Sequence, residues 1–183
     1  YLPADMSFTV DYLGAEVTQV GLNYSRPAAQ ILGQYYNFIR LGFEGYKNVQ
    51  YNSMQIANYF HEQIAAFPEF VPYSPEVPNP IVTWLMKPEV QKDAKWTLYD
   101  LQDKLAQHGW MVPAYAMPVN IQDMVVMRVL CKQGFSRDMC DELLHDIKAA
   151  VAELNALEYP TSTRIAMEKN VPLVSKSFNH TGK

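Results

Sequence analysis

Apolar and polar residues alternate near the start of the chain with the period of two that is typical of strands. The alternation runs over residues 8–12 and again over residues 18–24, and Leu13 and Gly14 interrupt it. Two strands alone are marginally stable, and no third strand lies beside them in the sequence. We therefore expect residues 1–25 to need a partner surface from outside this segment.

The period becomes helical after Ser25. This serine is a plausible N-cap, and Pro27 has the fixed φ of an early helical position. Two adjacent apolar stripes follow at helical spacings, formed by Ile31, Leu32, Tyr35, Tyr36, Phe38 and Ile39. Gly42 and Gly45 predict a bend, and a second helical run extends from residue 46 to about residue 67. Residues 26–68 are therefore predicted to form a long helical connector.

The next segment, residues 72–80, contains four prolines in nine residues and predicts a stiff loop. From Phe70 onward the pattern predicts strand, strand, helix, strand, strand and helix, with the later elements at 81–86, 97–107, 110–116, 123–132 and around 139–154. The last helix carries Met139, Leu143, Ile147, Val151 and Leu154 at intervals of three or four. This order predicts an α+β fold, a small antiparallel sheet with helices on one face. After Tyr159 the periodicity ends in a polar tail.

Composition limits the possible partners and sites. The 183 residues are 49 % hydrophobic and 19 % charged, which excludes a largely disordered chain. The net charge of −4 argues against nucleic acid or an anionic membrane as partner, and no apolar run reaches the roughly 18 residues of a membrane span. Two cysteines fit a reducing, cytoplasmic location. The histidines lack metal-ligand spacing and Cys131 and Cys140 fall in different predicted elements, so no metal site is expected.

Three residues are candidates for function, each with a structural alternative. Arg128 lies in an apolar strand, on one face with Met124, Val126 and Leu130. It is either a snorkelling or ion-paired structural arginine, or an anion receptor that binds a carboxylate through two N–H groups of its guanidinium. Ser25 is either a helix cap or a phosphate ligand. His180 lies in the tail and titrates near physiological pH. The sequence has no P-loop, no Gly-x-Gly-x-x-Gly and no nucleophile elbow.

Six segments in the same order resemble the C-terminal part of bacterial glutamate decarboxylases, which are pyridoxal-phosphate enzymes of fold type I. They are Asp11-Tyr-Leu-Gly14, Asn23-Tyr-Ser-Arg-Pro-Ala-Ala-Gln30, Gln34-Tyr-Tyr-Asn-Phe-Ile-Arg-Leu-Gly42, Thr97-Leu-Tyr-Asp-Leu101, Asp123-Met-Val-Val-Met-Arg128 and Ser177-Phe-Asn-His-Thr181. The resemblance implies that residues 1–25 are the last strands of the large cofactor domain and residues 26–68 the connector. Residues 69–158 would be the small C-terminal domain and residues 159–183 the tail.

The same resemblance implies decarboxylation of L-glutamate to 4-aminobutyrate and CO₂ with pyridoxal phosphate as cofactor. The family's Schiff-base lysine follows a histidine, but no lysine here does, so we expect that lysine upstream, no catalytic residue in this chain, and no activity of the chain alone. Arg128 would hold the substrate carboxylate. Ser25 would reach the cofactor phosphate of a neighbouring subunit, which implies a homo-oligomer. His180 would close the site at neutral pH and leave it in acid, in keeping with a role in acid resistance.

Some features depart from the family pattern. The tail is longer and has Asn179 where a basic residue is expected, and the proline-rich loop also differs. No basic, tryptophan-containing helix lies near the end of the chain, so a calmodulin partner is not expected. Two alternatives remain at this stage: the same domain from a decarboxylase of another amino acid, or a non-catalytic binding or oligomerisation module.

Overall fold

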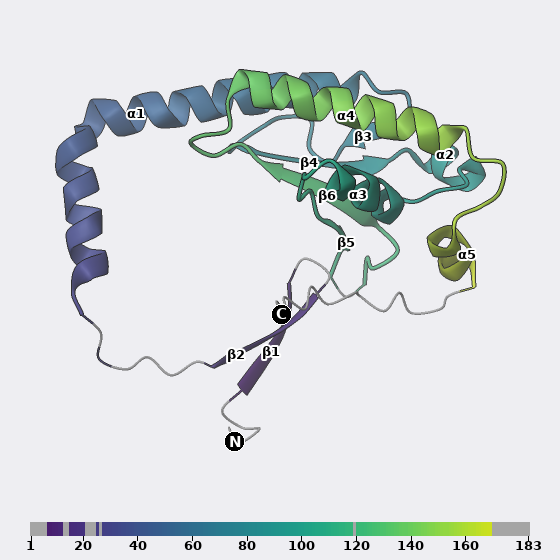
Figure 1. Cartoon of the computed structure of the whole chain (residues 1–183), viewed down its shortest axis with the longest axis horizontal. Coiled ribbons are helices and arrows are strands. Elements are labelled where there is room, and N and C mark those ends of the chain that lie inside the picture. Colours follow the sequence, from purple (N-terminus) through teal and green to yellow (C-terminus); the bar gives the residue numbers. More distant parts are fainter. Residues whose placement is uncertain (1–6, 13–14, 21–24, 26, 119, 170–183) are drawn as a thin grey trace. The chain divides into compact units, whose positions relative to one another are not determined.

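A computed structural model describes residues 7–12, 15–20, 25, 27–118 and 120–169 (Figure 1). The described chain divides into two compact units, one up to Tyr51 and the other beginning at Asn52. Along the sequence the chain has the strands β1 (Ser7–Tyr12), β2 (Ala15–Val20), β3 (Phe70–Pro72), β4 (Ile81–Met86), β5 (Ala114–Ala116) and β6 (Val125–Leu130). Its helices are α1 (Ala29–Ala65), α2 (Pro88–Asp93), α3 (Leu98–Gln107), α4 (Arg137–Asn155) and α5 (Ser162–Glu168).

The first unit contains an antiparallel pair of strands. β1 pairs with β2 in a register that runs from Ser7 opposite Val20 to Tyr12 opposite Ala15. The first predicted strand is confirmed, whereas the second begins at Ala15, three residues earlier than expected. Among the described residues the sheet has these two strands, as the sequence pattern indicated.

The helix α1 is bent where the sequence predicted a bend. Gly42 has φ 57° and ψ −169°, a left-handed conformation that glycine adopts at little cost because it lacks a Cβ. The expected cap is wrong. The amide of Leu32 donates to the carbonyl of Ala28 (3.0 Å), so the helix begins at Ala29, and Ser25 lies four residues before it. A cap must lie next to the first helical residue, and Ser25 does not.

The second unit is built on a four-stranded antiparallel sheet in the order β3-β4-β6-β5. The buried positions alternate along β4, with Val82, Trp84 and Met86 turned toward the core. The second half of α1, together with α3 and α4, packs its apolar residues on this face, and Figure 1 shows α1 and α4 running along the same side of the sheet. The predicted α+β fold with helices on one face is therefore confirmed.

Large aromatic side chains fill the core between the sheet and the helices. Phe60, Phe70, Trp84 and Trp96 are each no more than 1 % exposed. The ring centroids of Phe60 and Trp84 are 5.7 Å apart, and those of Phe70 and Trp96 are 6.5 Å apart and edge-to-face, an arrangement that aromatic quadrupoles favour. The indole Nε1 of Trp96 donates to the side chain of Asn155 (2.9 Å), which satisfies its one polar atom.

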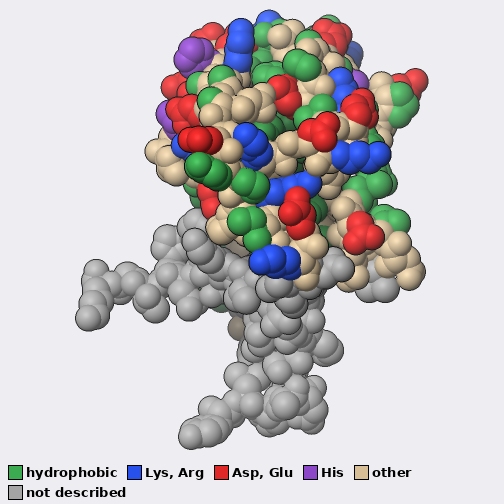
Figure 2. Space-filling view, turned by 90° about the vertical axis from the view of Figure 1, so that its right-hand side faces the viewer, with side chains coloured by type: hydrophobic (Ala, Val, Ile, Leu, Met, Phe, Trp, Pro, Cys, Tyr) green, Lys and Arg blue, Asp and Glu red, His purple; other side chains and the backbone are tan. Residues whose placement is uncertain are grey.

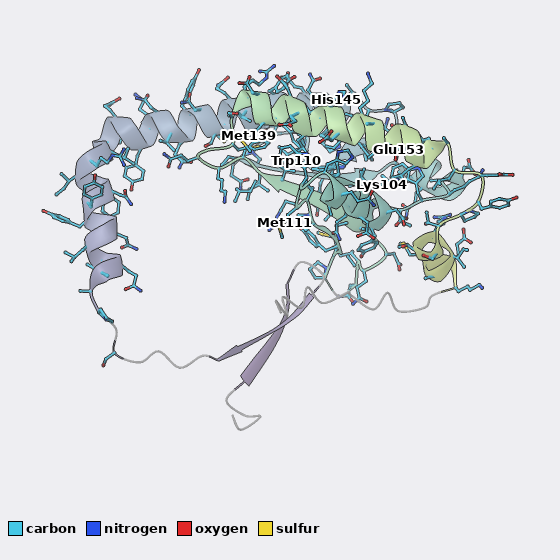
Figure 3. The ribbon with its side chains drawn as sticks, viewed as in Figure 1. Lys104, Trp110, Met111, Met139, His145 and Glu153 are labelled. Atoms are coloured by element: carbon cyan, nitrogen blue, oxygen red, sulfur yellow. The ribbon has the colours of Figure 1, made fainter. Side chains whose placement is uncertain are left out.

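Helices α3 and α4 begin largely as the sequence predicted. Thr97 precedes α3 and forms a capping box with Asp100, and Ser136 caps α4 by accepting a hydrogen bond from the amide of Met139 (3.2 Å). One detail differs, since Met139 is 40 % exposed and Cys140 takes the buried position in this turn. The two helices are also linked by an ion pair between Lys104 and Glu153 (2.8 Å), which Figure 3 labels.

Helix α5 contradicts the prediction that regular structure ends at Tyr159. The hydroxyl of Thr161 accepts a hydrogen bond from the amide of Arg164 (3.1 Å) and caps this short helix. Arg164 in turn donates to the carbonyl of Lys92 (3.1 Å). A helix of seven residues is too short to be stable by itself, so contacts distant in sequence stabilise it, and periodicity did not reveal it.

Charges are mixed over the surface of the second unit. Figure 2 shows acidic and basic side chains interspersed among apolar ones on the face in view. Within the described part of the chain, no helix combines the length and the apolar character that crossing a membrane requires.

Candidate functional site

Arg128 lies on the face of the sheet that points away from the helices. Along β6, Met127 and Val129 are buried in the core, while Arg128 alternates with them and is half-buried on the opposite face. Val126 and Leu130 share that face, as the strand pattern predicted. The arginine is therefore neither a core residue nor a fully exposed one.

Two side chains from the neighbouring strands flank Arg128. Thr83 on β4 is paired directly with Arg128, and Tyr115 on β5 is paired with Val126, one position along the same face. The guanidinium carbon of Arg128 lies 5.8 Å from the centroid of the Tyr115 ring, within the range of a cation–π contact. The arginine side chain thus has an aromatic neighbour on one strand and a hydroxyl-bearing neighbour on the other.

These residues line part of a groove of about 300 Å³. Its other wall is the proline-rich loop, which confirms the predicted loop and places it beside Arg128. The amide of Tyr73 donates to the carbonyl of Thr83 (2.9 Å) and fixes the start of the loop against β4. His61 of α1 also lines the groove, and its Nε2 lies 3.0 Å from the carbonyl oxygen of Ser74. Because a carbonyl only accepts, Nε2 carries a proton in this contact.

The guanidinium of Arg128 is a group of this groove that could bind a carboxylate. A guanidinium offers a planar fork of donors that matches the two oxygens of a carboxylate, and a half-buried position strengthens the interaction relative to open water. The sequence pattern singles out Arg128 but does not indicate its neighbours in the groove, Thr83, Tyr115 and His61. The alternation of β4 could have placed Thr83 on the outer face, but its pairing with Arg128 depends on strand register.

The structure describes one of the other two candidates. Ser25 is exposed and belongs to the first unit. His180 lies outside the described residues. Where the structure describes side chains, no three or more His, Cys, Asp and Glu residues are grouped so that they could hold a metal ion.

The two cysteines are buried free thiols in the core of the second unit. Burial raises the pKa of Cys131 to about 11 and that of Cys140 to about 12. A thiol with so high a pKa is almost entirely protonated at neutral pH and is a poor nucleophile or metal ligand. These residues are therefore packing groups in the reduced protein.

The chain is similar to known pyridoxal-dependent decarboxylases. Residues 1–87 match the family model described as the pyridoxal-dependent decarboxylase conserved domain. Glutamate decarboxylase beta of Listeria innocua is 39 % identical over 155 residues, which cover 85 % of this chain and 33 % of that protein. Glutamate decarboxylase of Aliivibrio fischeri is 40 % identical over 180 residues, covering 98 % of this chain and 37 % of that protein.

Solved structures give the same relationship. Glutamate decarboxylase of Lactobacillus brevis superimposes with a TM-score of 0.69 at 33 % identity, covering 86 % of this chain and 35 % of that one. A sphingosine-1-phosphate lyase of Burkholderia pseudomallei has a TM-score of 0.58 at 18 % identity, which indicates a shared fold alone. This chain spans about a third of the length of the curated relatives it matches. By these similarities, which extend over most of its residues, the chain is homologous to pyridoxal-dependent decarboxylases, and to glutamate decarboxylases among them.

Proposed function

We propose that this chain is the C-terminal portion of a glutamate decarboxylase, which converts L-glutamate to 4-aminobutyrate and CO₂. The half-buried Arg128 in its groove is the observation that carries the proposal, because a guanidinium there can receive the carboxylate of an amino acid. The similarity to glutamate decarboxylases from several bacteria supports glutamate as the substrate. In this proposal residues 1–25 complete the large domain, residues 26–68 connect, residues 69–158 form the small domain, and residues 159–183 form the tail.

Arg128 would act by positioning the substrate. The reaction breaks the bond between Cα and the carboxylate carbon, releases CO₂ and adds one proton to Cα. Which bond at Cα breaks depends on how the amino acid is held, so a fixed contact between Arg128 and a substrate carboxylate contributes orientation rather than chemistry. Net uptake of one proton is consistent with a role in acid resistance.

The cofactor in this proposal is pyridoxal phosphate, whose ring supplies an electron sink for the carbanion left by CO₂. The chain fits a partial contribution to that site. Ser25 is exposed and lies in a non-helical segment, so its hydroxyl is accessible to a phosphate. One hydroxyl cannot hold a cofactor, and no lysine follows a histidine in this sequence, so the remaining ligands would come from upstream residues and Ser25 would serve a neighbouring subunit of a homo-oligomer.

The C-terminal tail would regulate access to the site. We propose that His180 closes the site of a cytoplasmic enzyme at neutral pH and is released when the imidazole is protonated. Deleting the residues from Phe178 onward should extend activity of the complete enzyme toward neutral pH. An unchanged pH profile would remove the tail from the mechanism.

Substitution of Arg128 in the complete enzyme tests the central proposal. Arg128→Ala should lower kcat/KM by about tenfold to a hundredfold, because a charge-assisted hydrogen-bonding partner of the substrate is lost. The cofactor should stay bound. Arg137→Ala is a matched control, since Arg137 is an exposed arginine on α4 and contacts Tyr59 and Asp141 rather than the groove. Near-normal turnover by Arg128→Ala would contradict the receptor role.

A decarboxylase of another amino acid is the second candidate. A guanidinium recognises the carboxylate that all amino acids share, so this groove does not by itself select the glutamate side chain. Assaying the complete enzyme with several amino acids decides between the two. A preference for a substrate other than glutamate would replace the first proposal and keep the role of Arg128.

A further inference from the structure

Arg128 contacts a side chain of an adjacent strand in the groove. Tyr115 on β5 is the diagonal neighbour of Arg128 on β6, because Tyr115 pairs with Val126 two residues earlier. At this offset long and aromatic side chains on one face of a sheet reach one another. The guanidinium carbon lies 5.8 Å from the centroid of the ring, and both residues are half-buried walls of the same groove.

The backbone supports the same pairing. The amide of Arg128 donates to the carbonyl of Pro113 (3.3 Å), two residues before Tyr115. On the other side, β4 pairs Thr83 directly with Arg128. The backbone of Arg128 is therefore held by both neighbouring strands. The direction of its guanidinium depends on side-chain contacts.

We propose that Tyr115 is a positioning residue that holds the guanidinium of Arg128 in the direction needed to bind a substrate carboxylate. This inference rests on the proposed function of Arg128. An arginine side chain has several rotatable bonds, and binding a carboxylate immobilises them at a cost in entropy. A ring that already contacts the guanidinium restricts those bonds before the substrate arrives. The ring contacts the guanidinium through the ring face, so this contact does not use the in-plane N–H groups that hydrogen-bond a carboxylate.

The test compares Tyr115→Leu with Tyr115→Phe in the complete enzyme. Leucine removes the aromatic face and phenylalanine keeps it. The measurements are kcat and KM for glutamate, and the inhibition constant of glutarate, a five-carbon dicarboxylate that lacks the amino group and does not react. Tyr159→Leu is the control, because Tyr159 is 73 % exposed and lies between α4 and α5.

For Tyr115→Leu we expect KM and the glutarate inhibition constant to rise together by about threefold to thirtyfold, the range of a cation–π contact. The value of kcat should change much less, and both Tyr115→Phe and Tyr159→Leu should resemble the parent enzyme. In an Arg128→Ala background the leucine substitution should have little further effect, because the guanidinium that the ring contacts is gone.

The outcomes separate the two proposals. If Arg128→Ala weakens glutarate binding but Tyr115→Leu does not, Arg128 remains the receptor and the role of Tyr115 is overturned. If Arg128→Ala leaves glutarate binding unchanged, the receptor role of Arg128 fails and the present inference fails with it. If Tyr115→Leu lowers only the melting temperature, or if Tyr115→Phe is as impaired as Tyr115→Leu, the aromatic face does not position the arginine.

Discussion

Asp100 joins the start of α3 to the start of α5, and its substitution tests how the second unit holds its C-terminal helix. The Oδ2 atom of this carboxylate accepts three hydrogen bonds: from the amide of Thr97 (2.7 Å), from the hydroxyl of Thr97 (2.8 Å) and from the hydroxyl of Thr161 (2.9 Å). The amide of Thr161 also donates to the carbonyl of Lys95 (2.8 Å). One side chain thus caps one helix and anchors another.

The expected cost of Asp100→Ala follows from these contacts. Losing a helix cap costs about 1 kcal/mol, and leaving half-buried donors without a charged acceptor adds about 1.5 kcal/mol. We expect a loss of about 2 kcal/mol in the free energy of unfolding once partial solvent exposure is allowed for. In a unit of this size the loss corresponds to a fall of roughly 6–10 °C in the melting temperature.

Urea unfolding followed by tryptophan fluorescence measures this loss, because Trp96 is buried next to Thr97. Thr161→Val breaks the α5 contact and spares the α3 cap, so the double-mutant cycle with Asp100→Ala should give a coupling of at least about 0.5 kcal/mol. Asp103→Ala is the matched control, since Asp103 is an exposed carboxylate on the same helix. A stability of Asp100→Ala within about 0.5 kcal/mol of the parent chain, or a coupling near zero, would refute the reasoning.

Three further predictions concern surfaces and titrating groups. Leu32 and Tyr36 are 66 % and 62 % exposed on the first half of α1, so the 183-residue chain should self-associate. The double variant Leu32→Glu, Tyr36→Glu should have a lower sedimentation coefficient than the parent chain, and equal coefficients at high protein concentration would contradict this. Cys131 and Cys140 should be alkylated at pH 8 at least about 100-fold more slowly in the native chain than in urea, because a pKa raised from 9 to about 11 or 12 lowers the thiolate fraction by at least that factor. Similar alkylation rates in the two conditions would show that the native thiols are accessible. The hydrogen bond from Lys104 on α3 lowers the pKa of Glu153 below its ordinary value of 4.5. The ion pair therefore stabilises the fold above that pH, and this contribution is lost as the pH falls through the lowered pKa, so Glu153→Gln should flatten the acid limb of a plot of melting temperature against pH. An unchanged acid limb would exclude this contribution.

Local patterns were sufficient for most elements of the second unit. The predicted strand at residues 81–86 matches β4, and the predicted helix at 97–107 agrees with α3, because alternation, apolar spacing and a capping residue are properties of adjacent residues. The bend at Gly42 could be predicted because a glycine weakens a helix locally, whatever its distant neighbours. The cap at Ser25 was wrong because a serine and a proline in sequence do not determine which residue adopts the first helical conformation.

The candidate site was predicted only in part. Arg128 could be singled out from the sequence, since an arginine on an apolar strand needs a partner or solvent for its charge. Its neighbours could not, because Thr83 is 45 residues away along the chain and meets Arg128 only through strand register. The contact with Tyr115 and the loop wall fixed by His61 likewise depend on how separate elements pack.

By itself, the sequence determined most of the elements between Phe70 and Asn155, the apolar stripe of α4 except at Met139, and the position of Arg128 on a strand, because hydrophobic burial and backbone propensity act over a few neighbouring residues. The short helix α2 was not predicted. The tertiary structure decided that α5 exists, which side chains surround Arg128, and that Asp100 joins two helices. These features depend on hydrogen bonds and contacts between residues far apart in the chain. Their partners are chosen by the register of the sheet and the docking of helices, which no local pattern encodes.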